Sequence, residues 1–461
     1  MKQLSIRRDL VHPQSFLRNH PAVKTCRIRP QLIVLLIALA AAPIPVVFAQ
    51  ETAVAAPVVS LTVTADRPDA MYKVGETATF TIEVREDNQP SAEGEVVCVF
   101  SKDGWQPQSP RKLALEEGKA TVTGTLDEPG FLSLRVRFGK KTVLAGAGFD
   151  PRDIGPSRPT PDDFDAFWDE QKAALSQVAM ESTLTPVDSP VEGVEVFDVQ
   201  VECLGKPVSG YLGRPKDAKP KSLPAILTVH GAGVGSASLG RMQWAAREGG
   251  MLALDINAHG IPNGQPAAFY TELRQGKLKG YPHVGRQDRE ECYFKGMFLR
   301  VVRAIDFLTA QPEWDGKTLI VYGSSQGGFQ AIAAAGLDAR VSFICAGVPA
   351  GCDHTGSKAD RISGWPKLVP IDVEGEADPR ILQSARYFDC VNFAARAECE
   401  GAAVTVGLID RTCPPTSVYA AFNALEIPKT MHVDVAASHV NTPAAITFMR
   451  NAVSKHIREM R

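Results

Sequence analysis

Residues 318–337 read "TLIVYGSSQGGFQAIAAAGL", a β-prone apolar run followed by a serine and glycine turn and an alanine-rich, helix-prone run. Gly323–Gly327 within it fits G-x-S-x-G, the nucleophile elbow, in which the central serine stands on a sharp turn between a strand and a helix. The free N–H groups of a helix N-terminus would stabilise negative charge at Ser325. The pattern predicts that Ser325 is a nucleophile and that Ser324 is a spacer, with a plain Gly/Ser turn as the alternative.

Strand and helix patterns alternate from about residue 195 onward. An opening strand pair, "VEVFDVQV" and "VSGYLGR", precedes five apolar strand candidates: "PAILTVHG", "GMLALDIN", "TLIVYG", "VSFICAGV" and "AAVTVGLID". Residues 293–309 place apolar side chains on one face of a helix. Such alternation predicts a mostly parallel sheet with helices on both faces. With the elbow, it predicts an α/β-hydrolase catalytic domain over residues 162–461.

The region before this domain is patterned differently. Residues 57–149 contain short alternating or β-branched runs separated by turn residues, which predicts a small all-β, immunoglobulin-like sandwich. The proline-rich residues 150–161, "DPRDIGPSRPTP", predict a linker. Thr160 and Pro161 suit the N-cap and first position of a helix with an aromatic face that starts at Phe164.

The first residues have the composition of a secretory leader. Residues 1–30 hold seven Lys or Arg and one acid, and residues 32–42, "LIVLLIALAAA", form an apolar run that ends in "PIPVVFAQ". This predicts a signal peptide over residues 1–49, cleaved near Ala49–Gln50, and a secreted or periplasmic protein. The run is too short for a membrane span and is followed by prolines, so no stable span is expected after cleavage; an uncleaved anchor is the alternative.

The net charge and the cysteine content give no sign of a nucleic-acid partner or a disulfide framework. The formal net charge is −2, which gives no indication of nucleic-acid binding. One of the nine cysteines belongs to the leader, and the other eight show no disulfide framework, so their pairing stays open. No C-x-x-C or H-E-x-x-H spacing occurs, and the sequence predicts neither a metal nor a cofactor.

A nucleophilic serine needs a base and an acid that orients the base, and α/β-hydrolases place them in the chain order Ser, Asp or Glu, His. His439 in "AASHVNTP" lies just past a strand, in a loop flanked by small residues, so it can reach the serine. Asp410 ends "AAVTVGLID" and faces the same rim of the sheet as the elbow. The other candidates precede the serine, leave little room for an acid after it, lie within strands or near the chain end, or lack a strand leading into them: His230, His259, His283, His354, His432, His456, Asp389 and Asp434.

The oxyanion of a tetrahedral intermediate needs two N–H donors. One is expected from Gln326, the residue after the nucleophile. The other is expected from Ala232, because "HGAG" after "PAILTV" resembles an HGxG-type turn. By itself "HGAG" also fits a plain glycine turn.

Several stretches resemble one family. "CYFKGMFLRVVRAIDFLTAQPEWDGKTLIVYGSSQGG", "LDARVSFICAGVP", "GLIDRTCPPTSVYAAFNAL" and "PDDFDAFWDE" look like the acetyl xylan esterase and cephalosporin-C deacetylase family, carbohydrate esterase family 7. The resemblance covers residues 160–455 and implies Ser325, Asp410 and His439 as the triad. It also implies the backbone N–H groups of Gln326 and Ala232 as the oxyanion hole.

The chain departs from the family pattern at several places. Ala232 stands where the family usually has a tyrosine, "LDINAHG" where an Arg-Gly motif is common, and "SHV" where His-Glu is usual. The sandwich is absent from the common single-domain form. The resemblance also implies a ring-like homo-oligomer, which the additional domain could block.

These observations together predict a secreted serine carboxylesterase. It would remove acetyl or other small acyl groups from carbohydrate esters, such as acetylated xylan or oligosaccharides, through an acyl-enzyme and without a cofactor. One alternative is a prolyl-oligopeptidase-like peptidase. Residues 57–149 are, however, too few to form the β-propeller domain that this family usually has at its amino terminus. The other is a non-catalytic glycan-binding protein on a hydrolase fold.

Overall fold

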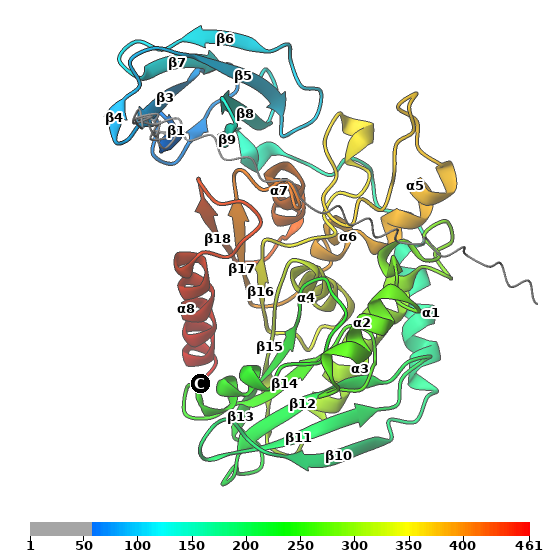
Figure 1. Cartoon of the computed structure of the whole chain (residues 1–461). Helices are drawn as coiled ribbons and strands as arrows, with labels where there is room; N and C mark the ends of the chain where they lie inside the picture. Colours follow the sequence, from blue (N-terminus) through cyan, green and yellow to red (C-terminus); the bar gives the residue numbers. More distant parts are fainter. Residues whose placement is uncertain (1–57) are drawn as a thin grey trace, which may run out of the picture. The chain divides into compact units, whose positions relative to one another are not determined.

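A nine-stranded sheet dominates the carboxyl-terminal part of the chain in the computed structural model, which describes residues 58–461 (Figure 1). The predicted signal peptide lies outside the described residues. Across the sheet the order is β10 (Ser182–Val187), β11 (Val194–Val201), β12 (Val208–Pro215), β14 (Leu252–Ile256), β13 (Leu223–Val229), β15 (Trp314–Ser324), β16 (Phe343–Gly347), β17 (Gly401–Gly407) and β18 (Lys429–Asp434). The pairs from β10 to β14 are antiparallel, and those from β14 to β18 are parallel.

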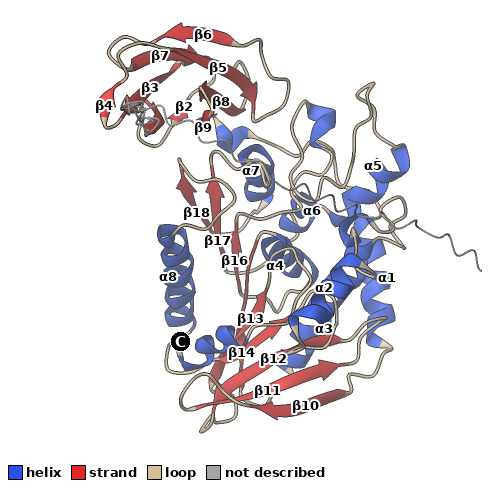
Figure 2. Ribbon diagram, in the orientation of Figure 1, coloured by secondary structure: helices blue, strands red, loops and turns tan. Residues whose placement is uncertain are grey.

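Helices cover both faces of this sheet (Figure 2). They are α1 (Phe164–Ser176), α2 (Ala267–Gln275), α3 (Tyr293–Thr309), α4 (Gln326–Leu337), α5 (Pro379–Ala385), α6 (Cys390–Ala394), α7 (Pro415–Ala424) and α8 (Pro443–Met460). Short 3-10 helices lie at Pro151–Asp153, Leu239–Ala246, Tyr281–His283, Gly356–Ala359 and Arg386–Phe388. Among residues 58–461, no helix is long and apolar enough to cross a membrane.

The strand period of two divides the core into two layers. Val321 of β15 packs in the cluster that holds α3 and α4, whereas its neighbour Ile320 packs in the cluster that holds α8. Both side chains are fully buried, as expected for a sheet covered on both faces. The predicted α/β-hydrolase architecture is therefore confirmed.

Two local expectations need correction. The sheet has an edge strand, β10, that the sequence did not indicate, because its residues are mostly exposed and it contains Pro186. Helix α1 starts at Phe164 with Asp163 at the N-cap, three residues later than expected. Thr160 therefore lies before the helix, where its hydroxyl donates to Asn392 Oδ1 at 2.7 Å.

The first nine strands form a two-sheet sandwich. One sheet holds β1 (Val59–Ala65), β3 (Ala78–Glu86), β4 (Gln89–Pro90) and β7 (Lys119–Gly124). The other holds β2 (Met71–Tyr72), β9 (Lys141–Phe149), β8 (Gly130–Phe138), β5 (Glu95–Lys102) and β6 (Arg111–Ala114). Inward-facing residues such as Phe80 and Phe100, whose rings are 6.0 Å apart, fill the space between the sheets.

The proline-rich segment after the sandwich is held along its length. The side-chain amide of Asn423 in α7 donates to the carbonyls of Pro151 and Ile154, each at 2.9 Å. The backbone N–H of Ser157 donates to Asp353 at 2.9 Å. These bonds fix the segment to the hydrolase domain.

Candidate active site

The elbow between β15 and α4 holds Ser325 in a strained conformation. Its φ of 57° and ψ of −120° lie outside the regions that L-residues favour. Such strain costs about 1–3 kcal/mol and persists only where the surroundings enforce it. Here the Ser325 N–H donates to Gly347 at 2.8 Å, and its carbonyl accepts from Phe329 and Ala350, each at 3.0 Å.

The glycines of the elbow are required by close backbone approach. A Cβ atom at Gly323 would lie 2.4 Å from the carbonyl carbon of Gly327. A Cβ atom at Gly327 would lie 2.3 Å from the carbonyl oxygen of Val229 in β13. Neither contact is possible in a folded protein, so G-x-S-x-G here is a steric requirement of the turn.

The three predicted triad side chains form one hydrogen-bonded chain. His439 Nε2 lies 2.9 Å from Ser325 Oγ, and His439 Nδ1 lies 2.7 Å from Asp410 Oδ2. A carboxylate only accepts, so Nδ1 carries the proton and Nε2 is free to accept from the serine hydroxyl. This arrangement lets the imidazole take the Ser325 proton.

The acid is buried and fixed. The side chain of Asp410 is 0% exposed, and its Oδ1 accepts from the backbone N–H groups of Thr412 and Cys413 at 2.8 and 2.9 Å. Asp410 lies three residues beyond the end of β17. Both oxygens of the carboxylate therefore have partners, and its orientation toward His439 is fixed.

Backbone bonds beyond the strand ends bring the acid and base loops together. The N–H of Ile409 donates to the carbonyl of Ala437 at 3.2 Å, which extends the pairing of β17 with β18. A Cβ atom at Gly407 would lie 2.4 Å from the same Ala437 oxygen. The close packing at Gly407 places Asp410 beside the loop that carries His439.

Ser324 faces a different partner from Ser325. Its Oγ accepts from Asn441 Nδ2 at 2.8 Å, and Asn441 Oδ1 accepts from Thr405 Oγ1 at 2.6 Å. These bonds tie the His439 loop to β15 and β17. Ser324 therefore bonds to a different partner from Ser325, as predicted for a spacer, and its anchoring of the loop is an additional role that the sequence did not indicate.

The two predicted oxyanion donors flank the serine. Gln326 is the first residue of α4, so its N–H has no partner within the helix. On the other side, a Cβ atom at Gly231 would lie 3.7 Å from Ser325 Cβ, which places the 230–233 loop against Ser325. Ala232 is exposed beside it.

Histidines hold the 230–233 loop in place. His230 Nε2 accepts from the N–H of Ala258 at 3.1 Å, and its Nδ1 lies 2.6 Å from the Gly231 carbonyl. His259 Nε2 lies 2.8 Å from the carbonyl of Gly233, so this nitrogen carries a proton. The sequence predicts His230 as part of the HGxG-type turn, but it does not indicate that His230 and His259 hold the loop.

Two tyrosines complete the support. Tyr293 Oη donates to His259 Nδ1 at 2.7 Å, and burial lowers the pKa of His259 to about 4, so the ring is neutral near pH 7. Tyr281 Oη donates to the side-chain carbonyl of Gln326, and burial raises the pKa of this tyrosine. No residue spacing marks either hydroxyl as part of the site, and their tertiary contacts identify them.

The competing histidines lie in other environments. His456 bonds to Ser342 at 2.9 Å and stacks on Phe343. His432 stacks on Phe448, with ring centroids 5.6 Å apart. His354 is fully buried, and burial lowers its pKa to about 4. None of these rings contacts Ser325.

Within the described residues, one group of potential metal ligands overlaps the triad. The ligand atoms of Asp410, Cys413 and His439 lie within 4.8 Å of one another. Burial raises the pKa of the Cys413 thiol well above its ordinary value, and the thiol is therefore protonated near pH 7. The two other residues already bond to each other, so their arrangement favours a triad.

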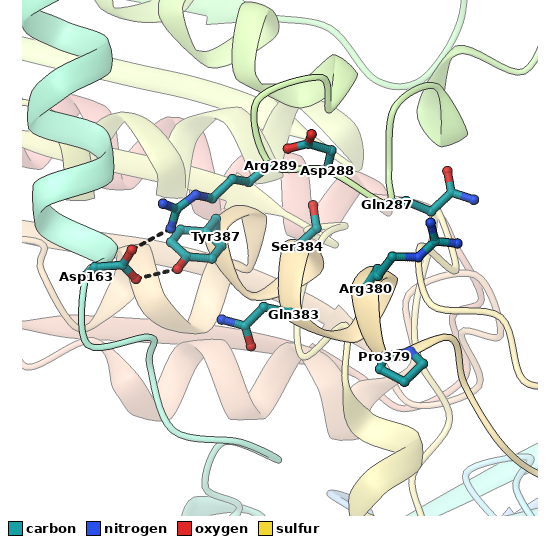
Figure 3. Close-up of a pocket in the computed structure, with 9 residues that line it drawn as sticks. All are labelled: Asp163, Gln287, Asp288, Arg289, Pro379, Arg380, Gln383, Ser384 and Tyr387. Atoms are coloured by element: carbon teal, nitrogen blue, oxygen red, sulfur yellow. Dashed lines mark hydrogen bonds and ion pairs between the residues drawn. The ribbon is translucent and has the colours of Figure 1, made fainter.

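A separate pocket of about 610 Å³ lies beside the N-terminus of α1 (Figure 3). Its wall includes Asp163, which accepts from Arg289 at 2.6 Å and also from the hydroxyl of Tyr387. No triad residue lines this pocket. Because this carboxylate, guanidinium and phenol bond to one another, they serve the packing of α1.

Comparison with known proteins identifies the family. The acetyl xylan esterase family model matches residues 152–458. The chain belongs to this family. It is therefore a carboxylic ester hydrolase, and membership supports carbohydrate acetyl esterase activity. The chain is also similar to acetyl esterase Axe7A of Xylanibacter ruminicola, with 31% identity over 387 residues, 81% of this chain and 85% of the relative.

Solved acetyl xylan esterase structures share the fold of the hydrolase domain. An acetyl xylan esterase from Paenibacillus sp. R4 is 30% identical with a TM-score of 0.57, covering 66% of this chain and 98% of its own. Acetyl xylan esterase 1 from Thermoanaerobacterium sp. JW/SL YS485 is 22% identical with a TM-score of 0.54, covering 65% and 97%. Both structures are covered almost entirely, whereas about a third of this chain is not. The β-sandwich, which ends at Phe149, lies outside the residues that the family model matches.

Proposed function

We propose that this protein is a serine carboxylesterase that removes acetyl groups from carbohydrate hydroxyls, such as those of acetylated xylan or oligosaccharides. The observation that carries the proposal is the hydrogen-bonded chain from Ser325 through His439 to Asp410 on a strained elbow. Family membership supplies the ester class. The acyl-enzyme route follows from the chemistry of these three side chains.

In the first half-reaction, His439 Nε2 takes the proton of Ser325 as the hydroxyl oxygen attacks the acetyl carbonyl. Negative charge then develops on the former carbonyl oxygen. The N–H of Gln326 and the N–H of Ala232 are the proposed donors to this oxygen. Asp410 holds the imidazole in the required tautomer and stabilises the imidazolium.

The intermediate then collapses. The bond between the carbonyl carbon and the sugar oxygen breaks, and His439 gives its proton to the leaving sugar hydroxyl. Water then enters, loses a proton to His439 and attacks the carbonyl carbon of the acetyl-serine. The bond from this carbon to Ser325 Oγ breaks, His439 returns the proton to Oγ, and acetate leaves. The proposed cycle uses one water and consumes no cofactor.

The deciding experiment combines a probe with a substrate panel. An organophosphorus reagent should label the intact protein but not Ser325→Ala, with one phosphoryl group per chain by mass spectrometry. Acetate release should occur from acetylated xylan or acetylated oligosaccharides and be lost in the variant. Labelling without acetate release from any acetylated glycan would remove the carbohydrate assignment, and absence of labelling would favour a non-catalytic glycan-binding role.

We also propose that the protein is exported. The support is the basic and apolar leader of residues 1–49. The eight described cysteines are all free and buried, so no disulfide bears on the question. Amino-terminal sequencing of the protein recovered outside the cytoplasm should begin at Gln50.

Sedimentation velocity would show whether the homo-oligomer implied by the family resemblance forms.

A further inference from the structure

The β-sandwich packs directly on the part of the hydrolase domain that carries the catalytic acid. The two domains belong to one compact unit, Pro57–Arg461. We call residues 408–419 the acid segment, since they run from the end of the β17 extension through Asp410 into α7. Three contacts from different parts of the sandwich converge on this segment.

The first contact involves strand β9. A Cβ atom at Gly146 would lie 2.6 Å from the carbonyl oxygen of Leu408 and 3.2 Å from its carbonyl carbon. Gly146 thus lets the strand backbone touch the backbone of the acid segment, two residues before Asp410. The backbone of Leu408 is itself anchored, because its N–H donates to Asp434 at 3.1 Å. Any side chain at Gly146 would have to displace this backbone.

The second contact is a hydrogen bond from the far end of the acid segment. The N–H of Thr416, in the first turn of α7, donates to Asp103 Oδ2 at 3.0 Å. Asp103 is buried and lies at the end of β5, where its own N–H bonds to Phe131 at 2.8 Å. A carboxylate acceptor there satisfies an N–H that the helix cannot.

The third contact is aromatic. Phe131 of β8 meets Tyr419 of α7 with ring centroids 5.2 Å apart, and both side chains are buried. Phe131 belongs to the core cluster of the hydrolase domain, although it lies on a sandwich strand. The two domains therefore share core at this point.

We propose that the sandwich is a positioning element of the active site, which holds the acid segment so that Asp410 stays aligned with His439. Family members without a sandwich would have to hold their acid in another way. The inference rests on the proposed serine mechanism. It predicts a loss of turnover when the contact is disturbed, because misalignment of the acid affects the chemical step, whereas the oxyanion loop and elbow stay in place.

The test compares two identical substitutions in the full-length protein. Gly146→Ala adds a methyl against the Leu408 backbone, while Gly155→Ala adds the same methyl where nothing lies within 4 Å. With nitrophenyl acetate as substrate, Gly146→Ala should lower kcat about tenfold or more with KM changed less than about twofold. Gly155→Ala should match the wild type in both constants.

A second pair covers the case in which Gly146→Ala does not fold. Asp103→Asn keeps an oxygen acceptor for Thr416, whereas Asp103→Ala does not. The asparagine variant should keep most of kcat and the alanine variant should lose it. Folding of each variant is checked by circular dichroism and by a melting temperature above that of the assay.

Several results would overturn the inference: a folded Gly146→Ala with wild-type kcat, a change in KM alone, or equal kcat for the two Asp103 variants. A change in KM alone would assign the sandwich to substrate binding instead. Failure of the proposed function is a different result, because the wild-type protein would then be inactive on the ester.

Discussion

Asn441 donates its side-chain amide to the hydroxyl of Ser324 at 2.8 Å, whereas the adjacent hydroxyl of Ser325 lies 2.9 Å from His439 Nε2. Two neighbouring serines thus have different tasks. Ser324 helps to anchor the loop that carries the base, and Ser325 is placed for attack. The difference can be measured.

Ser325→Ala should lower kcat by about 10⁴ or more with the fold intact, because no other group can form the acyl-enzyme. Ser324→Ala should lower kcat about tenfold or less, because it removes one positioning bond and leaves the nucleophile in place. Steady-state kinetics on nitrophenyl acetate checks both variants. Equal losses would contradict the assignment of Ser325.

Asp410→Asn should lower kcat by about 10³–10⁴, because an amide can donate to His439 and favour the wrong tautomer. Asp389→Asn is the matched control. Asp389 is another buried carboxylate that accepts backbone N–H groups, from Asp353 and His354, and lies outside the triad. Comparable loss of kcat in a folded Asp389→Asn would show that the effect of Asp410 is general destabilisation.

The support of the 230–233 loop gives a third prediction. His259→Phe keeps an aromatic ring but removes the bond to Gly233, so we expect kcat to fall about tenfold to a hundredfold with KM little changed. His456→Phe, the same change at a buried histidine bonded to Ser342, should leave kcat unaltered. Steady-state kinetics of the two variants tests this prediction. Equal kcat values would show that His259 does not support the oxyanion loop.

Much of this site could be predicted from the sequence because its parts sit at the ends of strands. The elbow glycines are dictated by local steric contacts, and Asp410 and His439 each follow a strand, apolar before Asp410 and more polar before His439, in the order that the fold requires. At these positions the local sequence pattern also determines the place in the fold, so the sequence motifs could predict the candidate triad residues.

The rest depended on contacts between distant parts of the chain. Tyr281 and Tyr293 contribute single hydroxyls that no spacing marks. The bond between Asp103 and Thr416 joins residues 313 apart in sequence. Strand β10 is exposed and has no apolar alternation to reveal it. The proline-rich segment has the composition of a linker, yet the Asn423 side chain holds it.

The pKa of Asp103 is raised to about 7, mainly by burial. The hydrogen bonds from Thr416 and the charge of Arg411 oppose this rise, and the charge of Asp410 contributes to it. The folded-state pKa exceeds the ordinary value of 3.8, so between these values the folded protein binds more protons than the unfolded chain. This carboxyl therefore reduces stability as pH rises from about 4 to about 7. Asp103→Asn should remove that dependence.

The measurement is the melting temperature of the two proteins across this pH range. Relative to the wild type, the Asp103→Asn variant should gain several degrees from pH 4 to pH 7. A constant difference over the range would mean that Asp103 does not titrate there. Glu117→Gln is a control at an exposed carboxyl of the same domain and should show no such trend.

The acyl group accepted by the enzyme should follow from the space beside the oxyanion loop. Ala232 is small and exposed and stands where the family resemblance implies a tyrosine, so we expect the space beside the oxyanion loop to admit an extra methylene. An added methylene changes binding by only about 1–3 kcal/mol in a pocket that admits it, whereas a chain too long for the pocket is rejected by steric clash. We expect acetyl and propionyl esters to be cleaved comparably and octanoyl esters poorly, measured as kcat/KM along a nitrophenyl ester series.

Ala232→Tyr should fill the space and raise the preference for acetyl over propionyl. A maximum at octanoyl in the wild-type protein would indicate a lipase-like acyl tunnel and would remove the deacetylase proposal.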